Sequence, residues 1–107
     1  MVNEIESEAL KARLGEAKAT APLLVDIRTP AEVAQGAIPG AQHIPMHLLP
    51  VRVAELPRDR DVVLYCRSGA RSYHACQYLA QHGFDNAVNL RGGIIAWVRH
   101  GFEIGRL

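Results

Sequence analysis

Short apolar runs alternate with amphipathic stretches along the chain. The runs 23–27 (LLVDI), 61–66 (DVVLYC) and 87–90 (AVNL) are brief and mostly apolar, as strands buried on both faces of a sheet are. A weaker run, 41–44 (AQHI), is predicted to form a fourth strand. Because stretches with helical spacing separate these runs, we predict that strands and helices alternate along the chain.

The helices are predicted from end signals as well as from spacing. The Ser7 hydroxyl is expected to cap a helix that runs to Arg13 or a little beyond, because it accepts from a free first-turn N–H. Pro30, after Thr29, suits the first position of a short helix, where no backbone N–H is missed. Further helices are predicted over 46–55 (weak, and shortened by Pro50), over 72–82 (ending at Gly83) and over 92–100.

This alternation predicts the fold class and the address of a functional site. Strands separated by helices of about ten residues imply right-handed crossovers and a mostly parallel sheet, so the fold is expected to be α/β. In such sheets, ligands bind beyond the carboxyl ends of the strands. Cys66 lies at one such end, Asp26 lies near another, and the turn 91–93 follows a third.

Composition adds little to this picture. The chain has 107 residues, 49% of them hydrophobic and 21% charged, which suits one soluble globular domain. The formal net charge of +1 gives no reason to expect a nucleic-acid or membrane partner. Two cysteines are too few for a disulfide framework, and the Glu-rich start has no signal-peptide core, so a reducing, cytoplasmic setting is expected.

The segment 66–72 (CRSGARS) carries the most distinctive chemistry. A loop between a strand and a helix directs backbone N–H groups inward and favours an anion at its centre. Gly69 permits backbone angles that other residues resist, and two arginines add positive charge. We therefore expect a lowered pKa for the Cys66 thiol, which would act as a nucleophile inside an anion site. The residues expected to bind substrate around it are Arg67, Ser68, Gly69, Ala70, Arg71 and Ser72.

The other polar and sulfur-containing residues are given plainer interpretations. Cys76 shares a helical stripe with apolar residues, which favours core packing over a redox role. Asp26 and Arg28 are expected to support the loop or to form an ion pair with each other. The spacing of His74, Cys76 and His82 relative to Cys66 matches no common zinc pattern, so neither a metal nor a cofactor is expected.

A few further residues near the predicted site have two readings each. Glu32 is expected to be an exposed helix residue or a partner of Arg28, and Arg91 either reaches the rim of the cleft or is simply exposed. Trp97 is expected to pack in the core or in a pocket wall.

The stretch 65–72 (YCRSGARS) resembles the active-site loop of rhodaneses, the sulfurtransferases. Two further segments carry the resemblance. The segment 25–45 (VDIRTPAEVAQGAIPGAQHIP) is similar to the family's D-x-R…E…G-H-I-P-G-A…I-P segment, and 89–104 (NLRGGIIAWVRHGFEI) is similar to its L-x-G-G-x-x-A-W…G segment. Together the three cover about residues 22–104. Ala37 departs from the family pattern, which commonly has His there.

The resemblance implies a structure and a reaction. It implies one rhodanese-like domain over residues 1–107, with a mostly parallel sheet of about five strands and helices on both faces. It also implies that Cys66 takes the outer sulfur of thiosulfate or a persulfide donor, and passes it from a Cys66 persulfide to cyanide or a thiol. Arg71, with Arg67, would orient the anionic donor. A sulfur-relay protein is a further possible partner.

Three other functions remain open at this point. Some phosphatases and arsenate reductases resemble the rhodanese fold but have a longer C-x5-R loop, whereas four residues separate Cys66 from Arg71 here. Inactive rhodanese-like domains serve as interaction modules, but this chain keeps the nucleophile and both loop arginines. A persulfide carrier that hands sulfur to a partner protein would use the same Cys66 chemistry.

Overall fold

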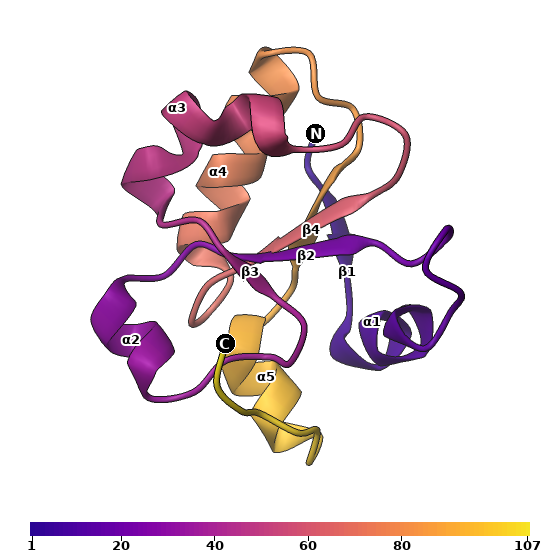
Figure 1. Ribbon diagram of the computed structural model, residues 1–107, viewed down its shortest axis with the longest axis vertical. Helices are drawn as coiled ribbons and strands as arrows, with labels where there is room; N and C mark the ends of the chain where they lie inside the picture. Colours follow the sequence, from indigo (N-terminus) through magenta and orange to yellow (C-terminus); the bar gives the residue numbers. More distant parts are fainter.

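The computed structural model describes residues 1–107 and is built on a five-stranded, fully parallel sheet of order β1-β5-β4-β2-β3 (Figure 1). The strands are β1 (Asn3–Ile5), β2 (Leu23–Asp26), β3 (Gln42–His43), β4 (Val62–Tyr65) and β5 (Ala87–Leu90). The helices are α1 (Ser7–Leu14), α2 (Pro30–Ala34), α3 (Leu49–Arg52), α4 (Ala70–Gln81) and α5 (Gly93–Arg99), with 3-10 turns η1 (Met46–Leu48) and η2 (Val53–Glu55). The α/β fold expected from the sequence is confirmed.

Helices cover both faces of the sheet, and each face has its own apolar core. Side chains of a strand alternate between faces, so Val62 and Leu64 of β4 point to one side and Val63 and Tyr65 to the other. On the first side they pack with α3 and α4, and on the second with α1 and α5 (Figure 1). Central β4, buried at all four positions, therefore ends between two packed layers. No helix has the length and apolar character needed to cross a membrane.

The four predicted strands are present, and β5 has the predicted bounds. The strand β1 was not predicted, because its three residues are mostly exposed and carry no alternating pattern. Its pairing partner is β5, far along the chain. Only this long-range pairing makes the segment a strand.

Two details of the predicted helices were wrong. Ser7 does not cap α1: Glu6 holds the cap position without a side-chain hydrogen bond, and Ser7 is the first helical residue, buried with its hydroxyl unpartnered. Helix α4 begins at Ala70 rather than at Ser72, with Gly69 as its left-handed cap (φ +98°). Arg71 and Ser72 consequently belong to the first helical turn, where backbone N–H groups are free to bind an external acceptor.

The amino end of α5 packs directly against the loop that follows β4. Its N–H groups at Ile94 and Ile95 donate to the carbonyl oxygens of Cys66 (3.0 Å) and Arg67 (3.2 Å). Gly93 makes this approach possible, because a Cβ there would lie 2.4 Å from the Arg67 carbonyl oxygen. The turn 91–93 thus fixes the conformation of the loop that carries Cys66.

This packing predicts the cost of a methyl group at Gly93. Gly93 and Gly101 both have positive φ (+59° and +76°), but a Cβ on Gly101 would meet no atom within 4 Å. Both alanine substitutions should incur the left-handed backbone penalty, about 1–2 kcal/mol. Gly93→Ala should lose a further ~1–3 kcal/mol through overpacking. Urea unfolding of the two variants checks this, and equal losses would contradict the close approach.

Candidate active site

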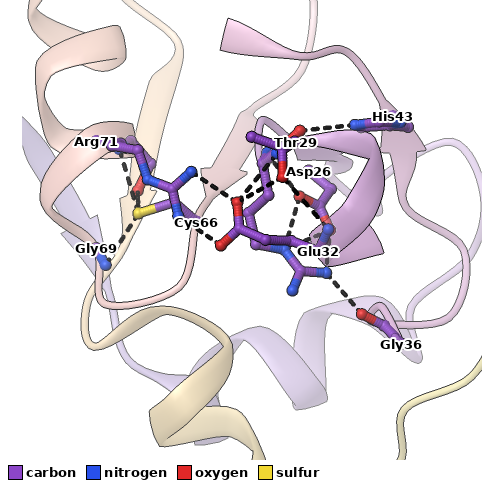
Figure 2. A network of polar contacts seen from close by, with 10 residues as sticks. Asp26, Thr29, Glu32, Gly36, His43, Cys66, Gly69 and Arg71 are labelled. Atoms are coloured by element: carbon purple, nitrogen blue, oxygen red, sulfur yellow. Dashed lines mark hydrogen bonds and ion pairs between the residues drawn. The ribbon is translucent and has the colours of Figure 1, made fainter. Parts of the chain in front are cut away.

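The sulfur of Cys66 lies at the carboxyl end of β4, at the amino end of α4. It accepts a hydrogen bond from the backbone N–H of Gly69 (3.1 Å; Figure 2). It also accepts from the backbone N–H (3.5 Å) and the hydroxyl (3.4 Å) of Ser72. Loop and first helical turn therefore curl around the sulfur, as an anion-binding loop does. The residue is fully buried, so a reactant reaches the sulfur only when neighbouring side chains move.

The hydrogen bonds around the sulfur favour its anionic form. Burial by itself raises the pKa of the Cys66 thiol, because it removes water from the charged form. The Ser72 hydroxyl and the backbone N–H groups of Ser72, Gly69 and Ser68 outweigh this effect, and the pKa lies below its ordinary value. The direction agrees with the sequence-based expectation, and hydrogen bonds from the loop and helix are its main cause.

The environment of Cys76 favours the neutral thiol instead of the thiolate. It is buried in the core between α4 and the sheet, and burial raises the pKa of its thiol to about 12. The thiol is therefore protonated at neutral pH, which suits the predicted packing role. Of the two free cysteines, only Cys66 is stabilised as a thiolate.

Asn89 of β5 connects the loop to the neighbouring strand. Its buried amide donates to the Gly69 carbonyl (3.2 Å) and the Glu4 carboxylate (2.9 Å), and its oxygen accepts from the Ser72 hydroxyl (2.5 Å). A hydroxyl has one hydrogen, so Asn89 competes with the Cys66 sulfur for the Ser72 donor. The sequence analysis missed Asn89, although a lone amide within the apolar run AVNL was a usable signal.

Arg71 is held by a carboxylate from α2. Its guanidinium forms two 2.9 Å hydrogen bonds with Glu32, a partner that the sequence analysis did not assign. Thr29, the cap of α2, fixes Glu32 from the other side through its N–H and hydroxyl. The Arg71 guanidinium, foremost, lowers the pKa of Glu32 to about 2. In Figure 2 the Arg71 guanidinium lies between the Cys66 sulfur and the Glu32 carboxylate.

Asp26 and Arg28 form a buried ion pair beneath α2. The shortest contact joins Arg28 Nη2 to Asp26 Oδ2 at 2.7 Å, with side chains only 7% and 0% exposed. Arg28 also donates to the Gly36 carbonyl (2.7 Å), and its own carbonyl contacts His43 Nε2 (2.8 Å). The pair thus ties β2 to the segments on either side of α2, and it favours the supporting role over direct contact with the sulfur.

The remaining predicted residues divide into two groups. Arg67, Ser68 and Ala70 have exposed side chains, and Arg67 has no carboxylate within ion-pair distance. Arg91 is also exposed, 4.0 Å from Glu6 rather than bound to the loop. Trp97, in contrast, is buried in the core beneath α5, as expected.

Comparison with known proteins agrees with this geometry. The model of the rhodanese-like domain matches residues 6–100. The chain belongs to this family. A "Sulfurtransferase" of Allochromatium vinosum is 64% identical over 97% of this rhodanese-like chain and 95% of its own length. The "Thiosulfate sulfurtransferase GlpE" of Stutzerimonas stutzeri is 37% identical over 73% of the chain and 71% of its own length.

A solved structure is similar along its whole length. The crystal structure of a rhodanese-like domain protein from Staphylococcus aureus has a TM-score of 0.86 and 34% identity, and 99% of each chain is covered. The sheet of five parallel strands is thus that of a rhodanese-like domain. The names of the relatives support sulfurtransferase function for the family to which this chain belongs.

The hydrogen bonds to the sulfur predict a pH profile for alkylation. In a Cys76→Ser background, the rate of reaction with iodoacetamide should rise through a midpoint below the free-thiol value of about 8.5. Ser72→Ala removes the hydroxyl donor, and should raise this midpoint by up to about one pH unit. A wild-type midpoint at or above that of a free thiol, or no shift on Ser72→Ala, would contradict this assignment.

The Glu32–Arg71 pair predicts a change in reagent preference. Glu32→Gln removes the carboxylate charge while keeping the side-chain shape, which leaves Arg71 free to attract an anion. The alkylation rate with anionic iodoacetate, relative to neutral iodoacetamide, should rise about two- to fivefold. Glu55→Gln is the matched control, because it breaks a similar two-contact pair with Arg52 away from the loop. An unchanged ratio in Glu32→Gln would show that the pair does not govern anion access.

Proposed function

We propose that this chain is a thiosulfate sulfurtransferase that works through a persulfide on Cys66. The observation that carries the proposal is the set of hydrogen-bond donors directed at the Cys66 sulfur from the loop and the first turn of α4. The name of the Stutzerimonas relative supports thiosulfate as a donor. Two free cysteines suit a reducing, cytoplasmic setting, which belongs to the same proposal.

In the first step, the Cys66 thiolate attacks the outer sulfur of thiosulfate. A bond forms between the two sulfurs, the original sulfur–sulfur bond of thiosulfate breaks, and sulfite leaves with the electron pair. Arg71 and Arg67 are the cations that would orient the anionic donor, since a guanidinium binds two oxygens at once. Because Arg71 is bound to Glu32 before the donor arrives, the donor competes with that carboxylate.

In the second step, the acceptor attacks the outer sulfur of the persulfide. With cyanide, a carbon–sulfur bond forms, thiocyanate leaves, and the Cys66 thiolate is regenerated with the electron pair of the broken bond. The loop N–H groups stabilise negative charge on sulfur in both steps, as an oxyanion hole does on oxygen. Two separate transfers through a covalent intermediate give ping-pong kinetics.

The length of the loop supports sulfur transfer over phosphate hydrolysis. Helix α4 begins at Ala70, so only residues 67–69 separate the nucleophile from the helix. Four residues separate Cys66 from Arg71, one fewer than in a C-x5-R loop, so the loop encloses less space around the sulfur. A single sulfur atom bonded to Cys66 needs less room than a phosphate with its oxygens.

Intact mass after incubation with thiosulfate tests the proposal. Wild type and Cys76→Ser should gain one sulfur atom and lose it on addition of cyanide, whereas Cys66→Ser should do neither. Cys76→Ser is the matched control, because it removes the other thiol and leaves the loop intact. If no variant gains sulfur, thiosulfate is not the donor. Robust Cys66-dependent hydrolysis of an aryl phosphate would instead favour a phosphatase.

A further inference from the structure

A pocket of about 470 Å³ opens beside the loop that carries Cys66. One side is made by Ile95, Val98 and Arg99 of α5, another by α2 and its flanks, and Ile104 and Arg67 complete it. Arg67 is the residue directly after Cys66, so the pocket adjoins the loop that carries this cysteine, although the buried sulfur itself does not line it. A volume of roughly 300–1,000 Å³ is typical of sites for organic ligands, and thiosulfate would fill only a small part of it.

The charged residues of this pocket are not balanced. Arg28 is neutralised by Asp26, and Glu32 is bound to Arg71. Arg67 and Arg99, in contrast, have no carboxylate within 4.0 Å and are both exposed. Two guanidinium groups without an internal partner favour an anionic ligand.

The wall between these cations is apolar. Val98 and Ile104 are 48% and 44% exposed, and they are among the few large hydrophobic side chains on the surface of the molecule. Both line the pocket, with half-buried Ile95 between the loop and Val98 on α5. Covering this wall with an aliphatic group would remove apolar surface from water, which an inorganic anion does not do.

The geometry of α5 sets the length of such a ligand. Gly93, the first residue of α5, touches the backbone of Cys66 and Arg67, and Arg99 is the last. Arg99 is six residues after Gly93, so at a rise of 1.5 Å per residue their backbones lie about 9 Å apart along the helix. A ligand that reaches from the sulfur to Arg99 therefore needs an aliphatic spacer of comparable length.

We propose that this pocket binds the sulfur acceptor, and that the acceptor is an organic thiol with an aliphatic chain and a carboxylate at its far end. The inference rests on the proposed function, because it needs a Cys66 persulfide. The acceptor thiolate attacks the outer sulfur of that persulfide, a new sulfur–sulfur bond forms, and Cys66 leaves as a thiolate. The carboxylate pairs with Arg99, and the chain lies against Val98 and Ile104. Thiosulfate, oriented by Arg67 at the near end of the pocket, is too small to cover Val98, Ile104 and Arg99, so that far part is free for the second substrate.

The test measures the acceptor step alone, on protein already loaded with sulfur and verified by intact mass. The probes are 6-mercaptohexanoate and 6-mercaptohexanol, which differ only in their terminal carboxylate or hydroxyl. This end is far from the thiol, so the two thiols are equally nucleophilic. In a Cys76→Ser background, the carboxylate thiol should half-saturate at about two- to fivefold lower concentration than the alcohol, as one exposed ion pair allows. Arg99→Gln should abolish this preference. Lys18→Gln, which removes an exposed charge from the loop before β2, should keep it.

A second variant tests the apolar wall. Val98→Thr keeps the shape of the side chain, and should weaken saturation by 6-mercaptohexanoate about two- to fivefold relative to the short anion 3-mercaptopropionate, which does not span the wall. If wild type shows no preference for the carboxylate, or if Arg99→Gln slows both long thiols equally, the proposal is wrong. In that case an acidic protein segment becomes the better occupant.

A separate measurement distinguishes this failure from failure of the proposed function. Protein that does not load sulfur from thiosulfate refutes the thiosulfate step, but the pocket is still testable with hexanoate, which has no thiol. NMR titration of Cys66→Ser should place the largest shifts at the methyl groups of Val98 and Ile104, and Arg99→Gln should weaken binding about two- to fivefold. Absence of saturable shifts there would refute the pocket whatever the outcome of loading.

Discussion

The chemistry of Cys66 depends on how α5 holds the peptide groups beside it. The N–H groups of Ile94 and Ile95 bind the carbonyls of Cys66 and Arg67, so these carbonyl oxygens point away from the sulfur. The N–H groups of the following residues are then left to face it. An oxygen turned toward the sulfur would repel a thiolate, whereas the N–H groups stabilise one. Gly93 allows the contact, because any side chain there would separate the helix from the loop.

The cation nearest to the Cys66 sulfur is paired within the protein. Arg71 brings a cation near the sulfur, but Glu32 already neutralises it, and Thr29 holds Glu32 in place. The Cys66 sulfur is therefore covered, and the cation nearest to it is already paired. Arg67 and Arg99, which have no acidic partner, carry the free positive charge of this face.

Local patterns predicted the strands β2, β4 and β5 and the address of Cys66, because buried parallel strands are short apolar runs whose ends meet at one edge. What the sequence did not predict depends on distant neighbours. Arg71 and Glu32 are 39 positions apart, so no local pattern selects one as the partner of the other. Ser7 does not cap α1 as predicted, because tertiary packing buries its hydroxyl in the first turn of the helix.

Strand β1 has a consequence for the order in which the molecule assembles. Asn3 of β1 pairs with Val88 of β5, so this edge of the sheet closes only after the chain has been synthesised as far as β5. Glu4, 85 positions before Asn89, is fixed by the same event. A growing chain on the ribosome therefore carries β1 unpaired until β5 has been made, and contacts of this separation are slow to form. The support that Glu4 gives to Asn89 is completed late in biosynthesis.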